Sequence, residues 1–397
     1  MSGELRQNGR RALLSEIRRS EIAPRIELSE STGISRATVT TITADLIREG
    51  LIEEVRDATP SKEIRRGRPK VDLKIRGAAH YVVGIKIAHR SLSMVLHDFE
   101  AKQLADLEID LEKSVFEAAE LAAELKQAIT DLAAKVGLTL EELSGIGVGI
   151  AGTVDAQNGL VYWSPSLSQR NLEMGRILRA YLGVPVFIDN DANLVAVAER
   201  AFGLGKGHSN FIVVTIESGV GMGVVIDNEL YRGNRGCGAE FGHTKVQLDG
   251  ALCRCGQRGC LEAYVADYAL LREASIARPD EGTTGVDDLL EAARKGDSVA
   301  KVIVGRAGRM FAMGLSNLIN IFDPELIILS GEQMQSDHLY ASEVIEAMRG
   351  SVVQLDKPGP EVVVHKWGDL MWARGAAAFA LDQVSEIAIT GRQLSAH

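Results

Sequence analysis

One histidine and three of the four cysteines in this chain lie close together, and this cluster limits the possible folds more than any other feature. Cys253, Cys255 and Cys260 fall within eight positions, and His243 lies ten residues before the first of them. Three soft thiolates and one imidazole suit a tetrahedral zinc ion. Glycines beside the cysteines allow the tight backbone that converging sulfur atoms need. The sequence therefore predicts a zinc site made by all four side chains.

A disulfide bond with one spare thiol is the alternative for these cysteines. It would require an oxidising compartment, and the N-terminus does not resemble a signal peptide. Cys237 lies outside the zinc spacing and is interpreted as a small free thiol. Because protein ligands fill all four positions around the ion, we expect the zinc to shape the fold rather than to act as a catalyst.

Charge is distributed unevenly along the 397 residues. Residues 1–76 hold 16 Lys and Arg against 12 Asp and Glu, a net charge of +4, so the remaining residues hold 28 against 42, a net charge of −14. An acidic body repels DNA, so any contact with nucleic acid must come from the basic head. No apolar run approaches the roughly 18–20 residues of a membrane helix. We expect a cytoplasmic protein.

The head has the pattern of a helix-turn-helix. The apolar pattern of residues 8–19 predicts a first helix with Leu13, Leu14 and Ile17 on one face. Pro24 opens a second short helix that carries Ile26 and Leu28. Gly33 permits a sharp turn and Ser35 can cap a third helix over 36–49, which would bury Val39, Ile42 and Leu46. A generic three-helix bundle is the alternative. The side chains expected to face DNA bases from the first turns of the third helix are Arg36, Thr38, Thr40 and Thr41.

A basic wing is predicted after the third helix. Residues 50–55 and 71–75 read as its two strands, and residues 62–70 as its tip. Between positions 62 and 76, seven residues are basic and two are acidic. An extended Arg-Gly-Arg-Pro run suits the narrow minor groove of DNA, so we expect contacts from Arg65, Arg66 and Arg68. A solvated linker between domains is the alternative for this segment.

From residue 77 onward, β-type apolar runs alternate with amphipathic helices, which predicts an α/β body with two sheets. The expected strands cover 81–87, 91–98, 103–109, 145–149, 186–190, 211–215, 223–226 and 325–329. The expected helices cover 115–136, 192–201, 301–322 and 372–380.

Two motifs of the body resemble the ROK family, which groups sugar-responsive repressors with sugar kinases. One is Ile216-Glu-Ser-Gly-Val-Gly-Met-Gly-Val224, followed by Gly233 and by Ala239-Glu-Phe-Gly-His243. The other is the Cys-x-Cys-Gly-x-x-Gly-Cys-Leu-Glu run that contains the expected zinc ligands. The resemblance spans about residues 77–385.

The resemblance implies an actin-like, hexokinase-type (ribonuclease H-like) body of two related lobes. The head would then be residues 1–76 and the body 77–397, with a first lobe of about 77–190 plus the C-terminal helix and a second of about 191–365. It also implies that zinc holds one nitrogen of His243 and leaves the other for a sugar hydroxyl. A role for Asp191 as a helix N-cap is the alternative at that position. The sugar-binding set implied by the family is Asn190, Asp191, Glu240, His243 and Glu262.

The chain departs from the kinases of this family where they bind phosphate. Their Asp-x-Gly-x-Thr loop corresponds to a stretch in which Lys86 replaces the aspartate and Ala88 and His89 replace the glycines. Without the acid nothing would hold Mg²⁺. Val220 stands where these kinases carry a threonine in their second glycine loop. The sequence Leu329-Ser-Gly331-Glu stands where they carry a Gly-Gly pair that contacts the nucleotide. We therefore expect no kinase activity.

Together these features predict a sugar-responsive transcriptional regulator, a repressor that a monosaccharide or sugar derivative releases from its operator. We expect a homo-oligomer, a dimer or a dimer of dimers, on palindromic DNA, because one head contacts too few bases for useful specificity. The alternatives are an active ATP-dependent sugar kinase with an accessory DNA-binding head, and a regulator released by a partner protein. Glucose, xylose, N-acetylated hexosamines and cyclic polyols remain open as effectors.

Overall fold

A computed structural model describes residues 3–55, 71–279, 285–331, 342–353, 359–366 and 370–391, together with Leu339 and Gly368. The chain divides into two compact units. Unit 1 contains Met1–Ile150, Asn158–Ile188 and Ala376–His397, and unit 2 contains Ala151–Gln157 and Asp189–Gly375. The head and the first lobe thus belong to one unit, and their division near residue 76 stays a prediction.

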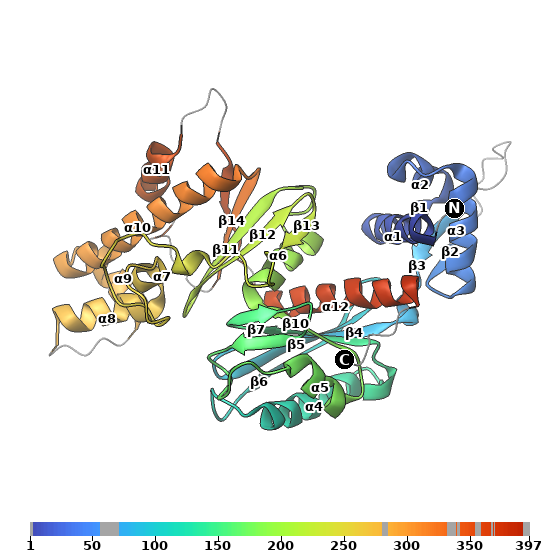
Figure 1. Ribbon diagram of the computed structural model, residues 1–397, viewed down its shortest axis with the longest axis horizontal. Coiled ribbons are helices and arrows are strands. Elements are labelled where there is room, and N and C mark those ends of the chain that lie inside the picture. Colours follow the sequence, from blue (N-terminus) through green and yellow to red (C-terminus); the bar gives the residue numbers. More distant parts are fainter. Residues whose placement is uncertain are drawn as a thin grey trace. The chain divides into compact units, whose positions relative to one another are not determined.

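The head folds as three helices and a small sheet, as the sequence predicted (Figure 1). The apolar face of α1 is buried at Leu13, Leu14 and Ile17, and that of α3 at Val39, Ile42 and Leu46. The three strands are ordered β1-β3-β2, so the first pairs with the returning strand of the wing. The elements are α1 (Gly3–Ser20), β1 (Ala23–Pro24), α2 (Arg25–Thr32), α3 (Arg36–Arg48), β2 (Ile52–Val55) and β3 (Asp72–Ile75).

The turn before α3 has the expected chemistry. Gly33 adopts the left-handed conformation at φ 67°, which favours glycine. The hydroxyl of Ser35 accepts a hydrogen bond from the backbone N–H of Thr38 at 3.3 Å and so caps α3. The second helix carries Ile26 and Leu28 as expected; Leu28 is buried and Ile26 is 47% exposed.

Several head arginines form ion pairs within the head. Arg6 of α1 pairs with Asp45 of α3, and the Nη1 atom of Arg10 donates to Glu49 at 2.9 Å. These ion pairs tie α1 to α3. The expected wing contacts Arg65, Arg66 and Arg68 lie outside the described residues.

Unit 1 also contains a five-stranded sheet of order β10-β7-β4-β5-β6. Helices α4 and α5 cover one face and α12 lies on the other (Figure 1). The helix expected at 115–136 begins only at Ala118. Glu117, the N-cap residue, and Glu120, in the first turn, form a capping box that fixes this start. The bounds are β4 (Tyr81–Ile87), β5 (Ser91–Asp98), β6 (Gln103–Asp110), α4 (Ala118–Ala134), β7 (Gly145–Ile150), α5 (Met174–Leu182) and β10 (Val186–Asn190), with short 3-10 helices at Gly77–Ala79 and Leu140–Glu142 and the short strand β9 (Leu160–Trp163). The short strand β8 (Thr153–Asp155) belongs to unit 2.

The sheet of unit 2 repeats this arrangement, with the order β13-β12-β11-β14-β15. In each sheet an antiparallel meander of three strands is extended by a parallel strand beside its first member. The body therefore has the two related lobes that the family resemblance implied. The strands are β11 (Phe211–Ile216), β12 (Val220–Ile226), β13 (Glu229–Tyr231), β14 (Leu326–Ser330) and β15 (Glu361–Val364).

Side chains on β11 alternate between the two faces of this sheet, as the period of a strand requires. Phe211 and Val213 pack on the side of α6, and Ile212 and Val214 pack in the larger core with α7, α8 and α10. The helix expected from 301 begins at Ser298, because the Asp297 side chain accepts from the N–H of Ala300 at 2.8 Å. The helices are α6 (Asp191–Phe202), α7 (Glu262–Val265), α8 (Asp267–Ala277), α9 (Val286–Arg294), α10 (Ser298–Phe322) and α11 (Ser342–Ser351), with a 3-10 helix at Phe241–His243.

Helix α12 (Met371–Thr390) is longer than the segment 372–380 expected from the sequence. Apolar residues continue to its end, where Leu381, Val384 and Ile389 are buried. Near this end Glu386 accepts from the Nε of Arg11 of α1 at 2.6 Å. No helix within the described ranges is both long and apolar enough to cross a membrane.

Candidate functional site

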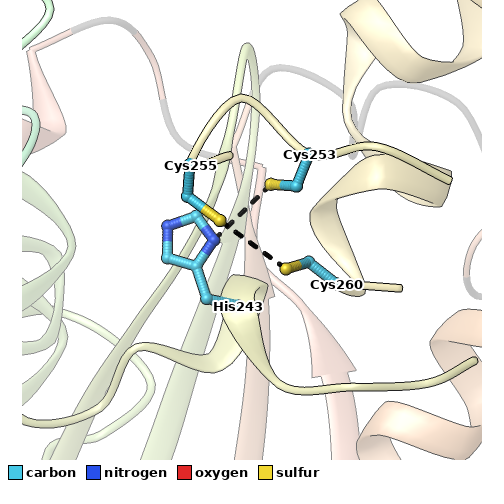
Figure 2. Close-up of side chains that lie close together, drawn as sticks. All are labelled: His243, Cys253, Cys255 and Cys260. Atoms are coloured by element: carbon cyan, nitrogen blue, oxygen red, sulfur yellow. Dashed lines mark hydrogen bonds between the residues drawn. The ribbon is translucent and has the colours of Figure 1, made fainter. Parts of the chain in front are cut away.

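The four predicted zinc ligands converge on one point (Figure 2). Their ligand atoms all lie within 4.8 Å of one another. His243 Nδ1 lies 3.7 Å from the sulfur of Cys253, and the sulfurs of Cys255 and Cys260 are also 3.7 Å apart. A tetrahedron with zinc–sulfur bonds of about 2.3 Å has edges of about 3.8 Å. The arrangement therefore fits a tetrahedral metal ion, and all four cysteines of the chain are free of disulfide bonds.

The loop that carries the cysteines folds through short-range hydrogen bonds. The N–H of Cys253 donates to the carbonyl of Gln257 at 2.8 Å, and the N–H of Gly256 donates back to Cys253 at 3.0 Å. Gly259 has φ 78°, and a Cβ there would lie 1.7 Å from the carbonyl oxygen of Gln247. Only glycine allows the backbone to approach that closely, which explains the glycine directly before Cys260.

The protein supplies a positive charge to the sulfur atoms. The Lys245 ammonium donates to the sulfur of Cys260 at 3.0 Å. Burial raises the pKa of the Cys253 thiol to about 12. Burial also acts to raise that of Cys255, but the N–H of Gln257 and the neighbouring cysteines outweigh it and lower the pKa of this thiol. A buried thiol such as Cys253 ionises when a metal replaces its proton.

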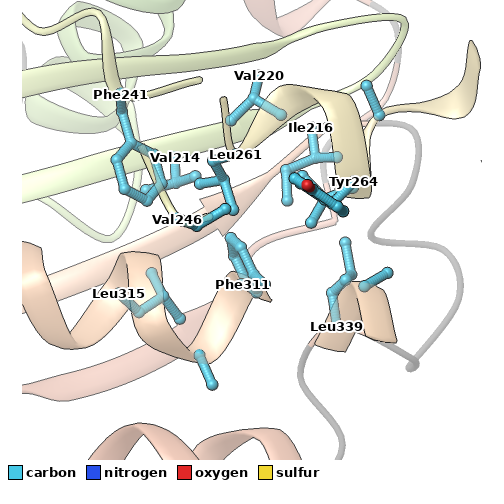
Figure 3. Close-up of a cluster of buried hydrophobic side chains, with 14 of the residues drawn as sticks. Val214, Ile216, Val220, Phe241, Val246, Leu261, Tyr264, Phe311, Leu315 and Leu339 are labelled. Carbon is cyan, nitrogen blue, oxygen red and sulfur yellow. The ribbon is translucent and has the colours of Figure 1, made fainter. Parts of the chain in front are cut away.

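The hydrophobic core of unit 2 anchors the segments around the metal site (Figure 3). Phe241, in the 3-10 helix between Glu240 and His243, is buried in this core. Leu261, between Cys260 and Glu262, is fully buried beside it. Each anchor holds a metal ligand on one side and a candidate sugar ligand on the other, so the core sets the positions of both.

His243 presents its two nitrogens to different partners. Nδ1 faces the cysteine sulfurs, and Nε2 lies 3.9 Å from a carboxylate oxygen of Glu240. Burial raises the pKa of Glu240, His243 acts to lower it, and the charges of Glu262 and Asp191 raise it further. The Glu240 side chain nevertheless keeps 48% of its exposure, so it is accessible to a ligand. Three acids and one imidazole thus share a local electrostatic environment.

Asn190, and not Asp191, is the N-cap of α6. Its Oδ1 accepts from the N–H groups of Ala192 at 2.9 Å and Asn193 at 3.4 Å, and its Nδ2 donates to the carbonyl of Gly152 at 2.8 Å. The alternative reading of Asp191 as the cap was therefore wrong, because Asp191 is the first residue of the helix itself. Asn190 holds the strand end in place and Asp191 follows directly after it.

A buried ion pair supports this strand end, and the sequence did not reveal it. Arg232 donates through Nε at 2.8 Å to Oδ2 of Asp189, whose side chain is fully buried. The other oxygen of Asp189 accepts from the N–H of Asn190 at 2.7 Å and from the side chain of Asn193 at 2.9 Å. The apolar run before Asp189 pointed to a buried acid, but nothing in the pattern identified Arg232 as its partner.

Glu262 connects the candidate sugar set to the metal site. Its Oε2 accepts from the N–H of Val220, in the glycine-rich loop, at 3.3 Å. Its Oε1 lies 3.5 Å from the sulfur of Cys253 and 3.2 Å from the hydroxyl of Tyr268. Tyr268 is a second residue that the sequence did not single out.

The residues compared above with the phosphate loop of family kinases lie at the end of β4. Lys86 is buried within the strand and pairs in register with Ser93 and Gly149. Ala88 follows the strand, and its N–H donates to the carbonyl of Ser91 at 3.0 Å. His89 is exposed in the turn.

The candidate DNA-reading residues lie on the outer face of α3. Arg36, Thr40 and Thr41 are exposed, and Arg36 retains 71% of its side-chain exposure. Thr38 is half-buried, and its hydroxyl hydrogen-bonds to that of Ser35 at 2.9 Å, so it contributes to the cap.

Comparison with known proteins places the chain in a family. The sequence pattern of the ROK family matches residues 82–383, and a winged helix-turn-helix DNA-binding pattern matches residues 10–53. The chain belongs to the ROK family. The similar proteins include both repressors and kinases.

A xylose repressor of Bacillus spizizenii is 31% identical over 84% of this chain and 84% of its own length. A glucokinase of Streptomyces coelicolor is 34% identical, but the match covers 62% of this chain and 82% of the glucokinase. The crystal structure of a ROK family transcriptional regulator, a homologue of the E. coli Mlc protein, superposes with a TM-score of 0.81 at 25% identity and covers 97% of this chain and 98% of its own. The ROK regulators therefore match both head and body.

Proposed function

We propose that this ROK protein is a sugar-responsive, DNA-binding transcriptional repressor. The observation that carries the proposal is the joining, in one chain, of a winged helix-turn-helix to a ROK body with a cluster of acids beside a metal site. The similarity to a xylose repressor over most of both chains supports the same function.

The sugar is bound by Asp191, Glu240, His243 and Glu262, with Asn190 holding the strand end beneath it. Carboxylates accept hydrogen bonds from vicinal hydroxyls, and the Nε2 atom of His243 can exchange its contact with Glu240 for one with a hydroxyl. The imidazole orientation depends on the metal, which in this proposal is one Zn²⁺ held by His243, Cys253, Cys255 and Cys260. With four protein ligands the ion is structural.

The protein does not phosphorylate its sugar. Lys86, Ala88 and His89 stand where family kinases carry an acid and glycines, so Mg²⁺ and phosphate lack their usual contacts. The partial similarity to a glucokinase keeps the kinase as the competing function.

The DNA partner is a palindromic operator bound by a dimer or a dimer of dimers. Arg36, Thr40 and Thr41 read bases from α3, Thr38 supports that helix from its cap, and the wing residues Arg65, Arg66 and Arg68 add contacts to phosphate or the minor groove. A cytoplasmic location and the oligomeric state stay predictions.

The test is binding by the purified full-length chain. D-Xylose, D-glucose, N-acetyl-D-glucosamine and myo-inositol are added in turn, and the melting temperature is recorded. A sugar at about 100 times its Kd stabilises the fold by about 2.7 kcal/mol, so its binding is readily seen. Asp191→Asn should abolish the increase.

Release of ADP is measured in the same samples after addition of ATP and Mg²⁺. We expect no turnover that depends on sugar. Sugar-dependent turnover that Asp191→Asn removes would make the protein a kinase. If none of the sugars raises the melting temperature, a partner protein becomes the better candidate for the signal.

A further inference from the structure

Tyr268 occupies a position between the candidate metal site and the candidate sugar site. Its hydroxyl lies 3.2 Å from Oε1 of Glu262 and 3.6 Å from the sulfur of Cys253. These two acceptors are themselves only 3.5 Å apart. One phenol therefore reaches both a metal ligand and a carboxylate of the sugar set.

The chemistry of the three groups changes when a metal binds. The sulfur of Cys253 lies 3.5 Å from Oε1 of Glu262, so a protonated thiol would donate to this carboxylate. A metal ligand must be a thiolate, so this proton is lost and two negative groups face each other. The Tyr268 hydroxyl carries one donor hydrogen and lies 3.2 Å from Oε1 of Glu262 and 3.6 Å from the Cys253 sulfur, so it can donate to either group. Among the residues that the structure describes, this hydroxyl is then the hydrogen-bond donor beside Oε1 of Glu262.

The surrounding arginines hold the phenol ring in place. The Arg254 guanidinium, between two metal ligands in sequence, lies 4.0 Å from the centre of the Tyr268 ring. Arg272 lies 6.0 Å from it and donates to the carbonyls of Leu252 at 2.8 Å and Ala263 at 2.9 Å. A cation over the face of an aromatic ring attracts the ring. Arg254 belongs to the cysteine loop, and Arg272 bonds to both this loop and α7, so the two arginines hold the Tyr268 ring close to both segments.

We propose that Tyr268 is a positioning residue that shares its hydroxyl proton between the Cys253 thiolate and the Glu262 carboxylate, and so links the metal to the bound sugar. This inference rests on the proposed function. A sugar hydroxyl that donates to Glu262 satisfies the carboxylate, and the phenol then donates more to the sulfur. Sugar binding is thereby sensed at the metal ligand.

Cobalt substitution of the full-length chain tests the metal half of this link without knowledge of the sugar. Co²⁺ replaces Zn²⁺, and the thiolate-to-cobalt charge-transfer absorption reports hydrogen bonding to the sulfurs. We expect Tyr268→Phe to bind one Co²⁺ per chain with a shifted band. Tyr264→Phe is the matched control, because the Tyr264 hydroxyl contacts Gln247 at 3.1 Å and the N–H of Ala251 at 2.8 Å. Its band should equal that of the wild type.

Titration with D-xylose and D-glucose tests the sugar half. For a sugar that binds the wild type, Tyr268→Phe should weaken affinity about tenfold, as expected for loss of a hydrogen bond to a charged group. In a Glu262→Gln background the same change should have a much smaller effect. Tyr264→Phe should leave the affinity unchanged.

Each result decides a separate point. An unshifted cobalt band, or loss of the metal, in Tyr268→Phe would overturn the link, because the residue would be either remote or merely structural. A shifted band with unchanged sugar affinity would also overturn it. If neither sugar binds the wild type, the proposed function lacks support for these sugars, and a shifted band still establishes the contact with Cys253.

Discussion

The cluster of candidate metal and sugar ligands in unit 2 and the helix α3 of the head use polar residues in opposite ways. In the cluster, side chains bind one another: the fully buried Asp189 pairs with the half-buried Arg232, and Glu262 contacts both Tyr268 and Cys253. On α3, Arg36, Thr40 and Thr41 face solvent: the two threonine hydroxyls donate to backbone carbonyls one turn earlier in the helix, and Arg36 lies 4.0 Å from Glu30. Changes in the cluster should therefore affect folding and ligand binding together, whereas changes on α3 should affect DNA alone.

Loss of a metal ligand should have the largest effect. Cys255→Ser should reduce zinc from one ion per chain to a small fraction and lower the melting temperature, because metal binding contributes to folding free energy. The sugar response should disappear with the zinc. Elemental analysis and thermal denaturation measure both.

Cys237→Ser is the matched control for this prediction, because Cys237 is a half-buried thiol outside the cluster. It should keep full zinc and sugar response. Unchanged zinc in Cys255→Ser would show that the four side chains are not the metal site.

Removal of Arg232, the half-buried partner of the buried Asp189, should have the next largest effect. Arg232→Ala leaves Asp189 charged and buried without its partner, which typically costs about 3–5 kcal/mol and should also weaken sugar binding through Asn190. Urea denaturation measures the loss. Adding Asp189→Asn should restore part of it, since the amide oxygen can still accept from Asn190 and Asn193. Equal free energies of unfolding for Arg232→Ala and the wild type would show that the ion pair does not stabilise the fold.

On the recognition helix the effect should be confined to DNA. Arg36→Ala should lose about 1–3 kcal/mol of discrimination between operator and random DNA, with unchanged stability and sugar binding. Arg19→Ala removes the same charge from an exposed arginine of α1 that pairs with Glu16, and it should retain discrimination.

Neutralising Arg65, Arg66 and Arg68 should weaken operator and random DNA about equally. Each lost phosphate contact should flatten the logarithmic salt dependence by roughly 0.9. Fluorescence anisotropy at several salt concentrations separates these outcomes. Selective loss of operator binding in the wing variant would instead assign base reading to the wing.

The smallest effect is expected at the exposed pair between Arg11 and Glu386 in unit 1. Their side chains keep 41% and 40% of their exposure, and pairs of this kind contribute about 0–1 kcal/mol. Glu386→Gln should therefore change the free energy of unfolding by less than about 1 kcal/mol. A larger loss would show that α12 holds the head more firmly than this contact suggests.

The convergence of the histidine and three cysteines and the fold of the head could be predicted because their signals are local. Three cysteines and a histidine occupy a short segment, and the glycine turn and serine cap lie directly before α3. Rare residue types and a helical period need no knowledge of distant contacts. The sugar set came from the family resemblance and not from any pattern.

The missed features depend on contacts between distant residues. Arg232 lies 43 positions from Asp189, and no spacing rule connects them. Tyr268 reads as an ordinary aromatic residue at the start of α8, and only the folded loop brings its hydroxyl to Cys253. The strand β1 is two residues long and exists because β3 offers it backbone partners. Such pairings follow from tertiary structure, which local sequence does not encode.

The most direct test of the central claim is operator affinity with and without sugar. An operator is first selected from random DNA with the full-length chain, and its affinity is measured by fluorescence anisotropy as D-xylose or D-glucose is added. A repressor predicts an inverted-repeat site and at least about tenfold weaker binding with the effector, which is about 1.4 kcal/mol of coupling. Asp191→Asn should bind the operator normally and ignore the sugar. A sugar that binds the protein but leaves operator affinity unchanged would contradict the account.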